Sequence, residues 1–185
     1  MTTTTARDGA AASTVAGVAA RAVIAAALAA VVTFSPDHTA RMGLLVLGGY
    51  LLVQAVVLGV GTPVLARTRL GRVLVVARAI ASLAGGLVAL SALDQGVGAL
   101  RPLEAVVFGV VGALEIVGGL LGGERSELAG DAVVVGGLQV LVGVLLVILN
   151  PDALFAVGVL SAWGAVVAVY LGISAANLRR RGARR

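Results

Sequence analysis

The chain has 185 residues, of which 59% are apolar and 12% are charged, and its mean hydropathy of +1.08 excludes an ordinary water-soluble domain. It contains no cysteine and a single histidine, which excludes disulfides, thiol nucleophiles, iron–sulfur clusters and multi-histidine metal sites. All 14 basic residues are arginine, so a P-loop lysine and Schiff-base chemistry are excluded as well.

Apolar stretches bounded by charges, proline or glycine predict an all-α integral membrane protein with six transmembrane helices. Each crossing of a hydrocarbon core about 30 Å thick needs about 20 apolar residues. The predicted spans lie near residues 15–34, 42–60, 73–93, 103–122, 132–149 and 153–173. They form a domain over residues 14–174, between a disordered cytoplasmic leader over 1–13 and a basic cytoplasmic tail over 175–185.

The first span has an alternative interpretation as a cleaved signal peptide, because Arg7 precedes an alanine-rich run. Cleavage would leave five spans and would place the arginine-rich flanks of the chain on opposite sides of the membrane. The segment is also long for the apolar region of a signal peptide, so we expect it to be retained as a span.

The arginines predict the orientation, because cytoplasmic loops of membrane proteins retain basic residues. With six spans, one side carries Arg7, Arg67, Arg69, Arg72, Arg125, Arg179, Arg180, Arg181, Arg184 and Arg185, and the other carries Arg41 and Arg101. We therefore expect a multi-pass protein of the bacterial inner membrane with both termini in the cytoplasm. The five tail arginines can bind anionic lipid headgroups or act only as a stop-transfer anchor. The basic charge thus reflects topology and predicts no nucleic-acid partner.

Three prolines are each followed seven residues later by a glycine, and each pair falls where an outside-to-inside span begins. The pairs are Pro36 with Gly43, Pro102 with Gly109 and Pro151 with Gly158. The shared spacing predicts a threefold repeat of parallel helical hairpins, with Pro36, Pro102 and Pro151 at the hairpin turns. Glycines also predict close helix packing in the membrane, most clearly Gly118, Gly119, Gly122 and Gly123. They would serve packing within the monomer or a homo-oligomer.

Three ionisable residues fall within the predicted spans: Arg21, Arg78 and Glu115. The arginines are close enough to the cytoplasmic ends to extend toward the headgroups, whereas Glu115 is the deepest charge in the chain. An ion pair of Glu115 with Arg78 is geometrically possible, and Arg21 is a second candidate. Such a pair would be structural. The alternatives are that Glu115 holds a proton when unpaired and relays it, or that it faces a cytoplasmic water pocket.

The remaining polar residues suggest no catalytic arrangement. Gln54 and Gln139 are expected to form interhelical hydrogen bonds, and Asp37, His38, Asp94, Glu104 and Asp152 are expected on a mildly acidic non-cytoplasmic face. The sequence contains no carboxylate pair, Ser/His/Asp order or metal-ligand spacing, so we expect no catalytic residue, no cofactor, no metal and no enzymatic activity.

The segment from Val142 to Arg181 resembles the final hairpin of the HdeD-like acid-resistance membrane proteins. The resemblance is carried by Gly143, Pro151, Trp163, Gly172, Ile173 and Arg179, and Glu115 is similar to a glutamate frequent in a return helix of that family. The first hairpin departs from the pattern, with Tyr50 in place of a tryptophan. The resemblance implies a small six-span bacterial membrane protein, linked in some members to acid or envelope stress, with no catalytic residues to transfer.

These observations favour a non-enzymatic bacterial membrane protein that acts through packing or partners in the membrane. The alternative is a small proton-linked transporter or channel in which Glu115 couples to protons.

Overall fold

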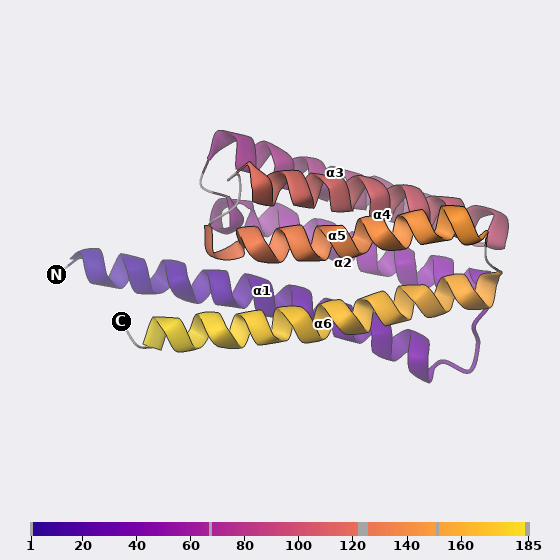
Figure 1. Ribbon diagram of the computed structural model, residues 1–185, viewed down its shortest axis with the longest axis horizontal. Coiled ribbons are helices and arrows are strands. Elements are labelled where there is room, and N and C mark those ends of the chain that lie inside the picture. The colour runs from indigo at the N-terminus through magenta and orange to yellow at the C-terminus, as the bar shows by residue number, and fades with distance from the viewer. Residues whose placement is uncertain (1, 67, 122–125, 151, 184–185) are drawn as a thin grey trace.

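The computed structural model describes the backbone of residues 2–66, 68–121, 126–150 and 152–183, and the side chains of residues 13–61, 66, 68–121, 128–150 and 152–181. This part of the chain contains six α-helices and no strand (Figure 1). The helices are α1 (Thr2–Phe34), α2 (Ala40–Leu65), α3 (Arg69–Ser91), α4 (Val97–Leu120), α5 (Ser126–Leu149) and α6 (Ala153–Ala183).

Each of the helices in the described ranges contains a stretch long and apolar enough to cross a membrane, which confirms the predicted all-α class and the predicted number of spans. Many large apolar side chains lie on the outer surface of the bundle, for example Val56, Leu87 and Val147. An outer surface of this kind is compatible with contact to lipid. The protein is therefore a multi-pass membrane protein.

The two termini lie at the same end of the bundle in Figure 1, together with the α2–α3 and α4–α5 connections. We call this end the terminal side and the other end the opposite side. α1 continues back from its apolar stretch, Ser13–Phe34, to Thr2. The segment predicted to be a disordered leader is thus helical from Thr2 onward, consistent with its content of alanine, the best helix former.

Helix starts are fixed by short polar side chains. Thr68 caps α3 by accepting a hydrogen bond from the Gly71 amide at 2.9 Å, and Asp152 accepts one from the Phe155 amide at 2.9 Å at the start of α6. α4 begins after Gly96, whose φ of 68° favours glycine. Its start at Val97 places Pro102 inside the helix, so Pro102 is not in a hairpin turn as predicted. Pro36 precedes α2 in the α1–α2 connection, and Pro151 lies outside the described residues.

The helices pack most extensively in three pairs: α1 with α6, α2 with α3, and α4 with α5. Figure 1 shows the first and last helices lying side by side along one flank of the bundle. The predicted hairpins would instead pair α1 with α2, α3 with α4 and α5 with α6. Equivalent glycines also differ, since a side chain on Gly43 would collide with Val157 and Leu100 whereas Gly109 and Gly158 have open space. The threefold hairpin repeat therefore stays a prediction.

Glycines bring the paired helices into backbone contact. A Cβ atom at Gly136 of α5 would lie 2.6 Å from the Gly112 carbonyl oxygen of α4, and one at Gly112 would lie 2.7 Å from the Gly136 carbonyl oxygen. Gly48 and Gly86 make the corresponding contact between α2 and α3, at 3.2 and 3.1 Å. Close approach of this kind supplies the helix contact that apolar burial cannot supply in lipid. Among the glycines predicted for packing, Gly118 and Gly119 are buried, and Gly122 and Gly123 lie outside the described residues.

Candidate functional site: a buried Arg–Glu–Arg cluster

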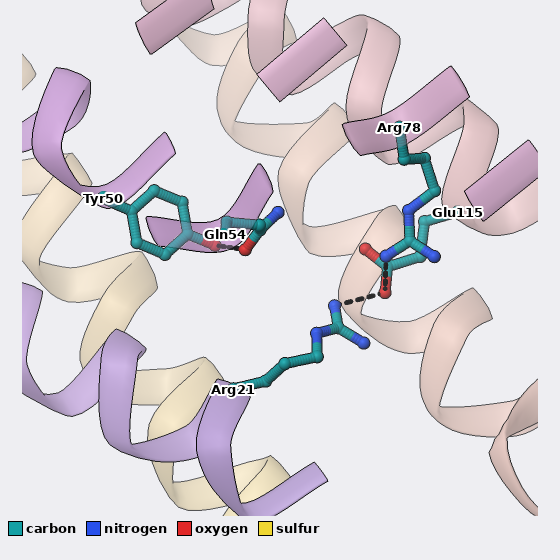
Figure 2. A network of polar contacts seen from close by, with 5 residues as sticks. All are labelled: Arg21, Tyr50, Gln54, Arg78 and Glu115. Atoms are coloured by element: carbon teal, nitrogen blue, oxygen red, sulfur yellow. Dashed lines mark hydrogen bonds and ion pairs between the residues drawn. The ribbon is translucent and has the colours of Figure 1, made fainter. Parts of the chain in front are cut away.

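Glu115 of α4 binds two arginines at once (Figure 2). Its Oε1 atom lies 2.5 Å from a guanidinium nitrogen of Arg21 on α1 and 2.7 Å from one of Arg78 on α3. The carboxylate is 0% exposed, the Arg78 side chain 1% and the Arg21 side chain 12%. We call these three residues the Arg–Glu–Arg cluster. The structure thus brings together the three intramembrane charges that the sequence singled out.

The cluster lies inside the bundle, among the apolar stretches of the helices and nearer to the terminal side. Glu115 is five residues before the end of α4 at Leu120, a depth of about 8 Å at 1.5 Å per residue. Arg78 is nine residues after the start of α3 at Arg69, or about 13 Å. The arginine side chains are long enough to approach the same carboxylate oxygen from two helices. Helices α1, α3 and α4 are therefore joined at one atom.

Pairing accounts for charges at this depth. An ionised side chain inside a membrane costs several kcal/mol unless it has a partner or water, and a carboxylate between two guanidinium groups is held by charge-assisted hydrogen bonds. The second carboxylate oxygen of Glu115, Oε2, has no hydrogen-bond partner among the described residues. In the cluster, one oxygen of Glu115 therefore binds two guanidinium groups, and the other oxygen remains available as a hydrogen-bond acceptor.

A second polar contact and an aromatic group lie beside the cluster. Tyr50 of α2 donates a hydrogen bond to the Gln54 amide oxygen on the same helix, and Figure 2 shows this pair next to Glu115 and its arginines. The Tyr50 ring packs edge-on against Trp163 of α6 with 5.4 Å between centroids, and Trp163 packs on Phe108 of α4 at 4.7 Å. We call Tyr50, Phe108 and Trp163 the aromatic cluster. Phe108 is seven residues from Glu115, so this cluster lies about 10 Å farther from the terminal side.

The predicted interhelical hydrogen bonds of the glutamines are not formed. Gln54 is bonded within its own helix, and the Gln139 amide oxygen has no partner among the described residues. Both side chains are buried. Their depth was predictable from the apolar sequence around them, whereas their partners depend on helix rotation, which the sequence does not specify.

Glu104 is the largest departure from the predicted polar residues. It was expected on an acidic outer face, but it lies inside α4 and is 0% exposed. Eleven residues separate it from Glu115, which places both on one face of the helix, since 11 residues turn it through three revolutions to within about 20°. That spacing was a signal available in the sequence. Pro102 nevertheless indicates a helix that starts just before Glu104, and this favours a position at the outer end of the span.

Sequence reasoning also missed an interhelical contact near the terminal side. Asp131 of α5 accepts hydrogen bonds from the Tyr170 hydroxyl at 3.1 Å and from the Ser174 hydroxyl, both on α6. At the opposite side, an exposed ion pair between Arg41 and Asp94 links the start of α2 to the α3–α4 connection. His38 lies in the α1–α2 connection. No group of three or more metal-ligating side chains occurs among the residues that the structure describes.

The chain was compared with protein-family models, with curated proteins and with solved structures, and none matches. The class of protein therefore follows from its own fold and site. It is a multi-pass helical membrane protein whose interior holds an Arg–Glu–Arg cluster. The resemblance to HdeD-like proteins stays a prediction.

Proposed function

We propose that this protein is a non-enzymatic membrane protein of the HdeD-like kind that supports the bacterial cell under acid or envelope stress. The observation that carries the proposal is the burial of Glu115 between Arg21 and Arg78. This arrangement fastens α1, α3 and α4 together inside the bundle. Its engagement with two arginines at once suits a structural element better than a catalytic group, which must exchange partners during a reaction.

The position of the cluster fits a protein that keeps its structure when one side of the membrane turns acidic. The aromatic cluster of Tyr50, Phe108 and Trp163 separates it from the opposite side, and apolar side chains of this size exclude water. In this proposal the aromatic cluster hinders the passage of protons from that side to the carboxylate. The stress role itself rests on the resemblance, and the cluster gives it a physical basis.

The proposed location is the bacterial inner membrane, with both termini in the cytoplasm. The clustering of arginines at the terminal side supports this orientation. Arg179, Arg180 and Arg181 are exposed near the end of α6 and are placed to bind anionic headgroups, while Arg184 and Arg185 lie outside the described residues. The glycine contacts within the bundle support packing in the monomer. Measuring the molecular mass of the protein in detergent would distinguish a monomer from a homo-oligomer.

A second candidate function is a small proton-linked transporter or channel that uses Glu115. The observation that favours it is the available Oε2 atom of Glu115, which could accept a hydrogen bond from water or from a hydronium ion. Such a protein would dissipate a pH gradient in proteoliposomes, and Glu115→Gln would abolish the flux. A structural protein would leave the gradient unchanged in both forms.

The proposed function is tested by survival of a deletion strain of the source bacterium at low external pH. The strain is complemented with wild type, with Glu115→Gln or with Asp94→Asn, and membrane insertion is verified for each. Asp94→Asn removes an ion pair that is exposed to solvent and is the matched control. We expect rescue by wild type and Asp94→Asn but not by Glu115→Gln. A deletion strain that survives as well as its parent would contradict the stress role.

A further inference from the structure

Glu104 is a buried carboxyl group that the proposed function does not use. It lies in α4, seven residues after Val97, on the half of the bundle nearer the opposite side. The residue is fully buried, and neither carboxyl oxygen has a hydrogen-bond partner among the described residues. Glu115 on the same helix face has two arginines, so the two glutamates occupy contrasting environments.

Apolar contacts surround Glu104 on the helices that pack against α4. Leu100, one turn before it, fits against Gly43 of α2, and Ala105, next to it, meets Gly143 of α5. Phe108, one turn after it, packs against Trp163 of α6, and Val107 packs against Gly85 of α3. Helices on every side therefore approach α4 through small or apolar residues around this carboxyl group.

Several charged and titratable side chains of these neighbouring helices are bound to other partners. On α2, Arg41 pairs with Asp94, and Tyr50 bonds to Gln54. Arg78 of α3 binds Glu115, and Asp131 of α5 bonds to Tyr170 of α6. Arg101, on α4 itself, is only partly buried and forms no ion pair with Glu104. No cation among the described residues thus forms an ion pair or hydrogen bond with Glu104.

We propose that Glu104 is an intramembrane proton-binding site that exchanges its proton with the opposite side of the membrane. A lone carboxylate in apolar surroundings costs several kcal/mol and becomes neutral by binding a proton. A proton needs no further ligand, whereas a metal cation requires several oxygen donors, and no such group surrounds Glu104 in the described structure. The ligand chemistry that fits this site is therefore a proton.

The backbone beside Glu104 provides a route for exchange. Pro102 has no amide hydrogen, so the Gly98 carbonyl lacks the hydrogen bond that a helix would give it, and Gly98 has open space around its α-carbon. This carbonyl is a polar position between the helix start and the carboxyl group. On the other side of Glu104, the aromatic cluster of Tyr50, Phe108 and Trp163 lies between it and Glu115, since Phe108 is between the two glutamates along α4. Exchange therefore occurs toward the start of α4.

The test is infrared difference spectroscopy of the full chain in lipid nanodiscs, which detects the carbonyl band of a protonated carboxyl group. We expect wild type to have this band at neutral pH, Glu115→Gln to keep it and Glu104→Gln to lose it. Glu104→Asp, which keeps a carboxyl group, should retain the band at a shifted frequency and serves if Glu104→Gln fails to fold. A wild type without the band, or a band that persists in folded Glu104→Gln, would overturn the assignment.

Exchange is measured by the shift of the same band after transfer into D₂O. We expect the wild-type band to shift, and Pro102→Ala to slow the shift about fivefold because it restores a hydrogen bond to the Gly98 carbonyl. Pro36→Ala, a proline replacement in the α1–α2 connection, is the matched control and should exchange at the wild-type rate. A band that never shifts, or one that shifts equally fast in Pro102→Ala, would contradict exchange by this route.

Discussion

At the scale of the residue, the central feature is one carboxylate oxygen shared by two guanidinium groups. Arg78 is almost completely buried and Arg21 reaches the cluster from its edge. Removing the carboxylate leaves both cations in apolar surroundings without their partner, which costs more than the pair itself contributes. The three residues should therefore be strongly coupled in their effects on stability.

Glu115→Gln should lower the free energy of unfolding by about 3–5 kcal/mol, the cost of breaking a buried ion pair. Arg78→Gln should cost more than Arg21→Gln, because the Arg21 side chain is 12% exposed and water can solvate part of it. Thermal unfolding of the purified variants in detergent micelles measures all three.

The control for this series is Asp94→Asn, which removes an exposed ion pair and should cost less than about 1 kcal/mol. The double variant Arg78→Gln/Glu115→Gln should be more stable than the sum of the single effects predicts, since both changes break the same Arg78–Glu115 ion pair. Additive losses would mean that the two residues do not interact energetically.

The sequence predicted this cluster in part. Arg21, Arg78 and Glu115 stand out because each interrupts an apolar stretch, and their similar depth follows from counting residues along helices. That one oxygen binds both arginines was not predictable, because it depends on how α1, α3 and α4 are rotated about their axes. The position of Glu104 was not predictable in this way, because Pro102 indicates a helix start whereas α4 begins five residues earlier, at Val97.

At the scale of the element, glycines decide which helix faces meet. Gly112 and Gly136 place the backbones of α4 and α5 in direct contact. Glu115 is three residues after Gly112 on α4, and both residues are buried in the interior of the bundle. The neighbouring glycine, Gly137, has open space around its α-carbon. Two adjacent residues of one helix thus differ completely in their tolerance of a side chain.

Gly136→Ala should destabilise the bundle by about 1–3 kcal/mol, the usual cost of forcing extra volume into a packed interface. Its Cβ would lie 2.6 Å from the Gly112 carbonyl oxygen, a backbone atom that cannot turn away. Gly137→Ala is the matched control and should cause no loss, because alanine favours a helix over glycine. Thermal unfolding of both variants is the measurement, and equal stabilities would contradict the close approach of α4 and α5.

Glycine pairs could be recognised as packing signals in the sequence, but not which helix each one contacts. Gly118 and Gly119 are buried in α4, whereas the proline–glycine spacing predicts hairpins that do not correspond to the most extensive helix pairs. Spacing along the chain specifies helix faces, and only the assembled bundle specifies their partners.

At the scale of the whole molecule, the first and last helices pack against each other. Gly164 of α6 meets Ala25 and Leu28 of α1, and the hydroxyls of Thr33 and Ser161 lie 3.0 Å apart nearer the opposite side. The packing of α1 on α6 encloses α2 and α4, which are the most buried of the described spans. α1 thus supplies one half of an extensive helix pair in the bundle.

Cysteine cross-linking tests this closure, because the chain has no cysteine of its own. The variant Thr33→Cys/Ser161→Cys should form an intramolecular disulfide on mild oxidation, since the replaced hydroxyls are in contact. Thr33→Cys/Ser174→Cys should not, because Ser174 is 13 residues farther along α6, or about 20 Å. Mass spectrometry of the oxidised and reduced proteins detects the bond, and its absence in the first variant would contradict the α1–α6 pair.

The proposed orientation of the bundle rests on charge, and single cysteines can test it because the chain has none of its own. Ten arginines belong to the terminal side by sequence and two to the opposite side, and basic segments are retained in the cytoplasm. Gln95 in the α3–α4 connection and Leu121 after α4 are exposed residues at the two ends. A single cysteine at either position therefore reports the side on which it lies.

In intact bacterial cells with a permeabilised outer membrane, a membrane-impermeant maleimide should label Gln95→Cys fully and leave Leu121→Cys unlabelled. Disrupting the inner membrane should make both react equally, which controls for differences in local reactivity. The reversed pattern would place the termini outside the cytoplasm, and the exchange side proposed for Glu104 would then face the cytoplasm. Labelling of both residues in intact cells would mean that the bundle inserts in two orientations, with its arginine asymmetry too weak to choose between them.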